Sequence, residues 1–286
     1  MNEKEFLKMV DELFNLSEKE HREVLKLYRK HRDNIKQFIA ELFMKYGNDG
    51  KVNVSDIPKI ERQIQEEIRN IAVSEIPMVA SILSTVFTLA YYRTAYMIEK
   101  TIHTTFSFSL LRKEVVDEIV NYNWSGIPFS QRIWNNANAL VNALRTELYI
   151  GIQQGESLDK IAKRIDKQFN SKAYQSQRLI RTESARVISS SQEKIYRESG
   201  VVKYLIYTAT LDNRTSQICR SRDGKKWRID DPERPMIPAH PNCRSCWIPA
   251  IEGYEPTKRK DNETKEIIEY KTYKEWAKAK GIQSPV

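Results

Sequence analysis

The sequence has few of the residues that build loop-based active sites. Its 286 residues include nine glycines, three cysteines and four histidines. So few glycines argue against a protein built around glycine-rich catalytic loops. Three cysteines cannot pair completely, so they favour a reducing environment and argue against a disulfide framework. The N-terminal residues include acids and lack an apolar segment, so we expect no signal peptide.

Long hydrophobic runs are also scarce. The main uncharged run covers residues 76–92, and its 17 residues sit at the short limit for a membrane span. It contains Pro77 and several hydroxyl side chains. We interpret this run as a buried helix of a bundle and expect no association with a membrane.

Charge, by contrast, is abundant. Charged residues make up 30% of the chain, and 47 lysines and arginines against 38 acids give a net charge of +9. Such a balance suits a polyanionic partner or an acidic protein surface, and it also suits simple solubility. The length exceeds that of most single domains, so two folding units are expected.

Apolar residues recur every three or four positions before residue 200, which predicts mostly helix. We expect one or two helices over 3–46, a turn at 47–50, a helix from Ser55 or Asp56 with Pro58 in its first turn, and an apolar helix over 76–106. Breaks at 121–128 and 151–155 flank a helix from a Ser130 cap to about 149. A Ser157 cap begins a helix over 158–169, and another runs from 173 to 199, where Gly200 ends it.

The composition changes after Gly200. Residues 201–210 are β-branched and aromatic and predict a strand, with shorter strands at 225–229 and 246–251. The charged segment 255–286 predicts a loop and a helix over about 270–279.

All three cysteines and one histidine fall between residues 212 and 246. Cys219, His240, Cys243 and Cys246 form a candidate tetrahedral Cys3His zinc site, in which a structural Zn²⁺ clips a small unit together. Three reduced cysteines without metal are the alternative. A Cys–His nucleophile pair, or a metal-dependent hydrolase using His240, is a further one. No helix-borne motif such as His-Glu-x-x-His supports catalysis, so no catalytic residue is predicted.

Four residues near these cysteines predict a pinned loop. Asp212, Thr215 and Asp223 favour turns through local hydrogen bonds to the backbone. Arg214 is expected to form a two-pronged ion pair with Asp212 or Asp223. The alternative is a substrate-binding arginine.

Basic residues concentrate between Lys160 and Gly200. Those at helical spacing form a candidate surface for the phosphate backbone of DNA: Lys163, Arg164, Lys167, Arg178, Arg181 and Arg186. Such binding is independent of base sequence and sensitive to salt. A solvated helix surface is the alternative.

Six short pieces follow one another in order. They are Gly-Ile-Gln-Gln-Gly-Glu-Ser from 151, Ile-Arg-Thr-Glu-Ser-Ala from 180, Tyr196 with Gly200, Asp-x-Arg-Thr-Ser-x-x-Cys from 212, Asp223-Gly224, and Pro-x-His-Pro-Asn-Cys-Arg from 238. Together they resemble the phage head-morphogenesis or minor head proteins of the Mu F-like type, over roughly residues 145–251. Departures are Ser216, where many members have a second cysteine, and the spacing Cys243-Arg-Ser-Cys246.

The resemblance implies a non-catalytic component of a tailed-phage head, located in the virion and in the host cytoplasm during assembly. Its implied partners are the portal protein, capsid or scaffold proteins and double-stranded DNA. Some relatives carry toxin or ADP-ribosyltransferase domains after the shared module. About 35 residues follow it here, too few for such a domain.

The predicted fold is α+β and mostly α. A helical domain over 1–150 would associate with portal or capsid, by analogy with the family. A module over 151–252 would combine helices with a small β-rich unit held together by zinc. Residues 253–286 would form a charged helical tail. Two alternatives to a minor head protein remain. One is a zinc- or thiol-dependent hydrolase or nuclease centred on His240, and the other is a basic, non-specific DNA-binding module.

Overall fold

A computed structural model describes residues 3–46, 54–251 and 257–279 of the chain. Helices hold 68% of the described residues, and the few strands in this part of the chain are short and antiparallel, which confirms the mostly α, α+β fold. The predicted turn at 47–50 lies outside the described residues.

The chain divides into two compact units, and each is assembled from separate stretches of sequence. Unit 1 contains Met1–Glu18, Leu83–Val120 and Arg181–Val286, and unit 2 contains Lys19–Ile82 and Asn121–Ile180. The predicted boundaries at residues 150 and 252 stay a prediction.

Three long helices each contribute residues to both units. They are α1 (Glu3–Tyr46), α2 (Ile57–Ile102) and α5 (Leu158–Ser199). The sequence predicts two helices in the region of α5, and this prediction is wrong, because α5 is one helix. In α2, Pro77 lies inside the helix. In α5, the buried positions Phe169, Ser176 and Ile180 keep helical spacing through the polar stretch that suggested a break.

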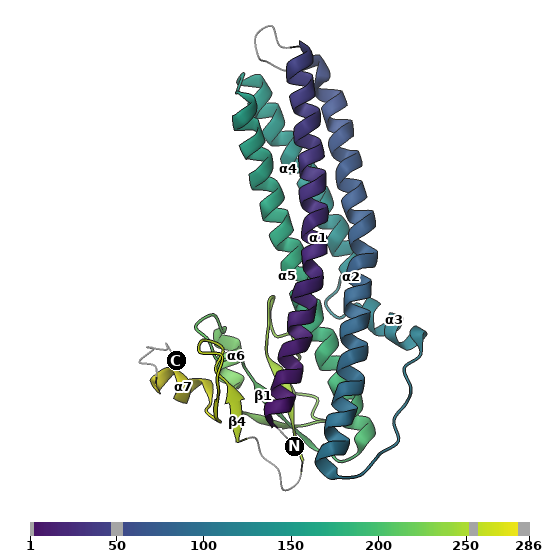
Figure 1. Cartoon of the computed structure of the whole chain (residues 1–286), viewed down its shortest axis with the longest axis vertical. Coiled ribbons are helices and arrows are strands. Elements are labelled where there is room, and N and C mark those ends of the chain that lie inside the picture. Colours follow the sequence, from purple (N-terminus) through teal and green to yellow (C-terminus); the bar gives the residue numbers. More distant parts are fainter. Residues whose placement is uncertain (1–2, 47–53, 252–256, 280–286) are drawn as a thin grey trace. The chain divides into compact units, whose positions relative to one another are not determined.

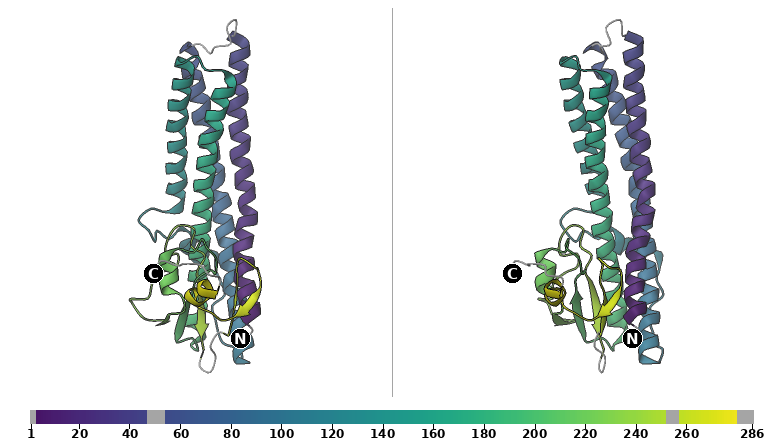
Figure 2. Two further views of the ribbon diagram at one scale, coloured as in Figure 1. Left: turned by 90° about the vertical axis from the view of Figure 1, so that its left-hand side faces the viewer. Right: turned by 60° about the vertical axis from the view of Figure 1, so that its left-hand side comes forward.

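Unit 2 consists of four helical segments that lie side by side (Figures 1 and 2). They come from α1, α2, α4 (Phe129–Gln153) and the first half of α5, with a short 3-10 turn at Val54–Asp56 before α2. The buried side chains repeat every three or four residues, as in Ile35 and Ile39 of α1 and Leu140 and Leu144 of α4. The N-cap of α4 is Pro128 rather than the predicted Ser130, because the helix begins at Phe129.

A buried carboxylate lies in the core of unit 2. Glu75 is 1% exposed and accepts hydrogen bonds from the hydroxyls of Tyr28 (2.9 Å) and Ser176. Burial raises the pKa of Glu75, and the two hydrogen bonds oppose that rise. Asn136 donates to the Tyr28 oxygen at 3.1 Å, so all four helical segments of unit 2 contribute to this cluster.

The apolar run of α2 has a packed face in this fold. By length and composition alone, α2 is able to cross a membrane, but 44% of the residues in its most apolar window are buried within the protein. Val79 and Ile82 are buried in unit 2, and Val86 and Phe87 in unit 1. This burial is typical of a core helix of a bundle.

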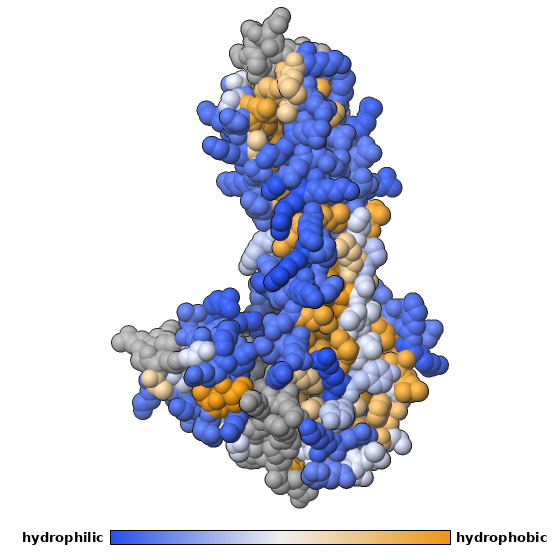
Figure 3. Space-filling model, viewed as in Figure 1, coloured by the Kyte–Doolittle hydropathy of each residue, from blue (hydrophilic) through white to orange (hydrophobic). Residues whose placement is uncertain are grey.

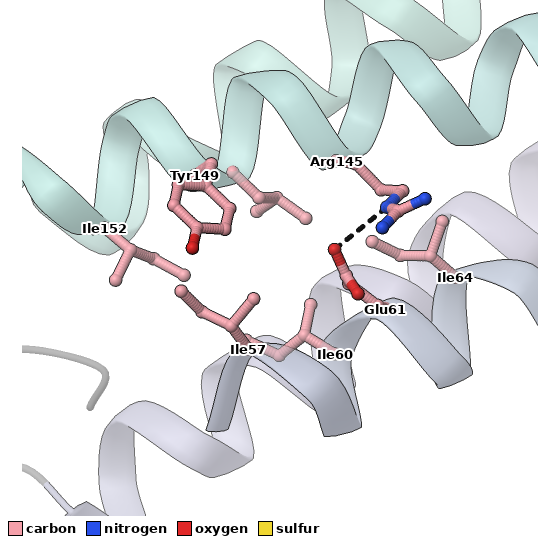
Figure 4. Close-up of a pocket in the computed structure, with 8 residues that line it drawn as sticks. Ile57, Ile60, Glu61, Ile64, Arg145, Tyr149 and Ile152 are labelled. Atoms are coloured by element: carbon pink, nitrogen blue, oxygen red, sulfur yellow. Dashed lines mark hydrogen bonds and ion pairs between the residues drawn. The ribbon is translucent and has the colours of Figure 1, made fainter. Parts of the chain in front are cut away.

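Unit 2 also has a shallow apolar pocket between α2 and α4, lined by isoleucines including Ile57, Ile60 and Ile152 (Figure 4). An ion pair from Arg145 to Glu61 (2.9 Å) closes one side. The space holds about one water molecule. It is therefore too small for a cofactor.

Unit 1 combines helices with a three-stranded antiparallel sheet in the order β2-β1-β3. The strands are β1 (Tyr204–Thr208), β2 (Lys226–Arg228) and β3 (Cys246–Ala250). They confirm the predicted strands with shorter ends. Gly200 ends α5 with a φ of 68°, as predicted for a C′ glycine. The hydroxyl of Tyr196 donates to the carbonyl of Trp247 (3.1 Å), which ties α5 to β3.

Several small elements of unit 1 were not predicted. They are α3 (Lys113–Asn121), α6 (Gln217–Arg222) between β1 and β2, and the hairpin of β4 (Lys258–Lys260) and β5 (Ile267–Glu269). The predicted C-terminal helix is α7 (Tyr273–Ala279). Trp276 of α7 is buried against Leu211 and donates to Asp261 at 2.8 Å, which fastens α7 and the hairpin to the loop after β1.

Candidate metal-binding site

The structure brings three of the four predicted zinc ligands together. The Cys219 sulfur lies 3.2 Å from Nε2 of His240 and 3.9 Å from the Cys243 sulfur, and the three donor atoms lie within 4.8 Å of one another. Cys219 comes from α6, whose N-cap Ser216 accepts a hydrogen bond from the Cys219 N–H (3.3 Å). The other two come from the loop before β3, so the group joins two segments of the chain.

The ring of His240 is oriented by its own loop. Nδ1 of His240 lies 2.8 Å from the carbonyl oxygen of Pro241. A carbonyl only accepts, so Nδ1 carries the proton and Nε2 presents its lone pair to the thiol of Cys219. This tautomer is the one that a metal ion bound through Nε2 requires.

The two thiols of the group differ in acidity. The hydrogen bond from Cys219 lowers the pKa of Cys243 to about 5 against the effect of burial, helped by the backbone N–H groups of Ala239 and Ser245. The same hydrogen bond, together with burial, raises the pKa of Cys219 to about 12. The Cys219 thiol carries one proton, so the sulfur of Cys243 and Nε2 of His240 are alternative acceptors for it.

Cys246 lies outside the three-residue group. It opens β3, where it pairs with Thr208, and burial raises its pKa to about 12. The charges of Arg259, Cys243 and Asp223 act on its thiol. Cys246 thus belongs to the sheet.

Two thiols and an imidazole nitrogen are donors that zinc and similar ions prefer. The group could therefore hold a metal ion. Cys219 is 2% exposed and Cys243 is not exposed, while His240 is half-buried. The buried thiols are poorly placed for attack on a substrate, so the geometry suits metal binding better than a Cys–His nucleophile pair.

The predicted pinned loop is present, but another arginine forms its two-pronged ion pair. Arg244 donates to both oxygens of Asp212 (2.5 and 2.9 Å), and the backbone N–H of Arg214 and the hydroxyl of Thr215 also reach Asp212 (3.0 and 3.1 Å). The Arg214 side chain is 77% exposed and 3.6 Å from Asp212. Burial would raise the pKa of Asp212, but the hydrogen bonds and charge of Arg244 outweigh it and lower that pKa.

Asp223 is held by a residue from the hairpin. Arg259 donates to both its carboxylate oxygens (2.8 and 3.1 Å), and both side chains are 1% exposed. Asp223 also accepts from the N–H of Ala209 (2.7 Å), and Arg259 donates to the carbonyls of Ala209 and Lys271. The sequence analysis missed Arg244 and Arg259, since nothing in their local sequence marks them as partners of the two aspartates.

The six predicted DNA-contacting residues have different environments. Lys163 and Lys167 are exposed on α5. Arg164 pairs with Glu147 and Glu156, and Arg181 pairs with Glu18. Arg178 is half-buried. Arg186 is buried, pairs with Glu183 and donates to the carbonyls of Ile119 and Val120, so it holds α3 on α5.

A family model matches part of the chain. Residues 142–248, which include α5, the sheet and the three-residue group, match the model described as Phage Mu protein F like protein. This region is therefore similar to the phage Mu F-like proteins. Cys219, His240 and Cys243 lie inside the matched region.

Two curated proteins resemble this chain. The minor head protein GP7 of Bacillus phage SPP1 is 26% identical over 306 aligned residues, which cover 98% of this chain and 97% of GP7. An NAD(+)–arginine ADP-ribosyltransferase, EFV, of Enterococcus faecalis is 29% identical over 203 residues, or 65% of this chain. The chain spans 41% of the length of that enzyme. No solved structure matches the chain.

Proposed function

We propose that this chain is a minor head protein of a tailed bacteriophage, built into the head in the host cytoplasm and retained in the virion. The observation that carries the proposal is the match to the minor head protein GP7 over nearly the full length of both chains. The Mu F-like region supports the same role in head morphogenesis. The partners we propose are the portal protein first, then capsid or scaffold proteins.

Exposed aromatic and aliphatic side chains of unit 1 supply a surface for such a partner. Tyr92, Phe106 and Phe108 form edge and tilted ring contacts, and the hydroxyl of Tyr92 accepts the N–H of Leu111 (3.1 Å), so the segment after α2 is fixed on the helix. Tyr96 is 62% and Leu110 is 77% exposed. Hydrophobic residues are visible over this part of unit 1 in Figure 3. Exposed aromatic clusters are enriched at protein interfaces.

Portal binding is tested by co-expressing the full chain with the portal protein of the same phage. We expect the two to co-purify and to migrate together in gel filtration. The double variant Tyr96→Ser, Leu110→Ser should weaken capture at least tenfold, while Met236→Ser, which alters a side chain 61% exposed elsewhere, should not. If the wild-type chain does not co-purify with portal, the portal part of the proposal is wrong.

Contact with double-stranded DNA is the second part of the proposal. Its support is the net charge of +9 and two of the exposed lysines of α5, Lys163 and Lys167. Since Arg164 and Arg181 are paired and Arg186 is buried, we assign the phosphate contacts to the lysines.

A salt series of DNA-binding measurements tests this assignment. Replacing both lysines with glutamine should weaken binding and reduce the slope of log affinity against log salt by about 2. Replacement of Lys26 and Lys30, two exposed lysines of α1, is the control. Binding that is independent of salt, or equal losses in both variants, would remove Lys163 and Lys167 from the proposal.

We propose no enzymatic activity for the chain. The burial of Cys219 and Cys243 supports this, because a substrate does not reach either thiol in the folded protein. The test incubates the purified chain with NAD⁺ and an arginine-rich protein, and separately with DNA and divalent metal. Transfer of ADP-ribose to the protein would establish the activity named for the enterococcal relative. DNA cleavage that His240→Ala abolishes would establish the nuclease alternative.

A further inference from the structure

We propose that Cys219, His240 and Cys243 bind one Zn²⁺ through three protein donors, and that Cys246 is not a ligand. The ion would join α6 to the loop that precedes β3. This inference is independent of the proposed role in the phage head, since it concerns only the folding of unit 1.

The separations between the donor atoms match those around one zinc ion. Two thiolates about 2.3 Å from a zinc ion at a tetrahedral angle lie about 3.8 Å apart, and a thiolate and an imidazole nitrogen lie about 3.6 Å apart. The sulfurs of Cys219 and Cys243 are 3.9 Å apart, and the Cys219 sulfur is 3.2 Å from Nε2 of His240. These two separations therefore lie within a few tenths of an ångström of those around a zinc ion, and the third, between Cys243 and His240, is within 4.8 Å.

The surroundings of the donors are those of a metal site. Metal-bound histidines donate their second ring nitrogen to a carbonyl or carboxylate, and His240 faces the carbonyl of Pro241 through Nδ1 (2.8 Å). Cys219 lies 3.2 Å from the hydroxyl of Tyr207, and the backbone N–H groups of Ala239 and Ser245 face the sulfur of Cys243. Such donors stabilise metal-bound thiolates.

The position of Cys246 limits the protein ligands to three. Its backbone is fixed in the β1–β3 ladder opposite Thr208. Its sulfur is near enough to Cys243, Arg259 and Asp223 to feel their charges, but it is not among the three donor atoms that lie within 4.8 Å of one another. The half-buried His240 borders solvent, so water is the expected fourth ligand.

The ion would stabilise a part of unit 1 that has little regular structure. Between β1 and β3, the structure has only the six-residue helix α6 and the three-residue strand β2. A metal ion that links Cys219 to Cys243 closes this segment, so binding free energy becomes folding free energy. We therefore expect the metal-loaded chain to resist unfolding better than the metal-free chain.

Metal content of the full chain is the first measurement. The protein is purified with Zn²⁺ present, dialysed against metal-free buffer and assayed by elemental mass spectrometry. We expect one zinc ion per chain in the wild type and in Cys246→Ala. Cys219→Ala, Cys243→Ala and His240→Gln should each retain less than a tenth of that content.

The number of sulfur ligands is the second measurement, and it uses Co²⁺ in place of Zn²⁺. The sulfur-to-cobalt absorption should correspond to two thiolates, and Cys246→Ala should leave the spectrum unchanged. His240→Gln replaces a half-buried loop residue. It is the variant that removes a ligand if the cysteine variants do not fold. A three-thiolate spectrum that loses intensity in Cys246→Ala would replace this proposal with a Cys3His site.

Two other results would overturn metal binding altogether. A wild-type chain that takes up neither Zn²⁺ nor Co²⁺ under reducing conditions has no such site. The alternative is that Cys219 and Cys243 form a disulfide. In that case the isolated chain has a mass lower by two hydrogens. It then takes up metal only after reduction, and in less than stoichiometric amount.

Discussion

Two buried aspartates of unit 1 and one buried glutamate of unit 2 are stabilised in opposite ways. In unit 1, Asp223 and Asp212 each meet an arginine that donates to both carboxylate oxygens. In unit 2, Glu75 accepts hydrogen bonds from the neutral hydroxyls of Tyr28 and Ser176. A full ionic partner keeps a buried carboxylate charged, whereas burial without a charged partner favours its protonated form, even though hydroxyl donors oppose that shift. The comparison predicts opposite responses to mutation and to pH.

The construction of the units explains this difference. Unit 2 is a set of long helices, whose apolar faces supply the burial. The sheet region of unit 1 has short strands and long connections, so ion pairs link segments that no regular element joins. Removing a partner should therefore have its largest effect in unit 1.

Replacement of Arg259 should give the largest loss. In Arg259→Met, Asp223 stays buried without its cation, and we expect a loss of about 3–5 kcal/mol in the free energy of unfolding of unit 1. Urea unfolding followed by tryptophan fluorescence measures this loss. Lys258→Met, at the exposed neighbouring position, should change it by about 0.5 kcal/mol or less.

A double variant separates the ion pair from other contacts of Arg259. If the unpaired charge causes the loss, Asp223→Asn in the Arg259→Met background should recover part of it. If Arg259→Met lowers the free energy of unfolding by less than about 1 kcal/mol, water can replace the ion pair. The contrast between Asp223 and Glu75 would then be wrong.

The helices were the part of the fold that the sequence predicted best. Apolar spacing identified α1 and the buried faces of α2 and α5, because the spacing of buried residues follows from helix geometry alone. The break placed within α5 was wrong. The polar residues near 170 are local signals against a helix, and the packing of the flanking turns outweighs them.

The candidate site was predicted in part for a similar reason. His240 and Cys243 are close in sequence, so a short loop holds them together, and Cys219 follows the neighbouring strand. Arg244 and Arg259 lie 32 and 36 residues from the aspartates they bind, and nothing in their local sequence specifies those partners. The prediction that Arg214 fills this role fails because its side chain points to solvent.

Arg244 and Arg214 form a matched pair for the second prediction. Arg244→Met removes both hydrogen bonds to the buried Asp212, and since Arg244 is 32% exposed we expect a loss of about 1–3 kcal/mol. Arg214→Met should cost about 0.5 kcal/mol or less. Thermal unfolding of the two variants measures the difference. Equal losses would mean that Arg214 contributes to the ion pair in solution.

The contribution of Asp212 to the stability of unit 1 should be lost in acid. Its pKa is lowered in the folded protein, so its stabilising contribution is complete above its ordinary pKa near 3.8 and is lost as pH falls below that value. Asp212→Asn should therefore be less stable than the wild type at neutral pH, and the gap should narrow in acid. A gap of constant size would show that Asp212 acts without its charge.

Glu75→Gln should give the smallest effect and the opposite sign. The pKa of Glu75 is raised, so its contribution is greatest below the ordinary value of 4.5 and falls as pH rises through the raised value. Glutamine keeps hydrogen-bonding groups near Tyr28 and Ser176 and carries no charge. We expect the variant to gain on the order of 1 kcal/mol over the wild type at neutral pH and nothing in acid.

Hydrogen exchange of backbone amides in α2 and α4 between pH 5 and 8 measures this gain within unit 2. Glu66→Gln, an exposed neighbour on α2, is the control and should follow the wild type at every pH. If Glu75→Gln instead destabilises unit 2 at neutral pH, then the charged carboxylate is the form that the core selects. The contrast with the arginine-paired aspartates of unit 1 would then fail, because both units would be built to hold a buried negative charge.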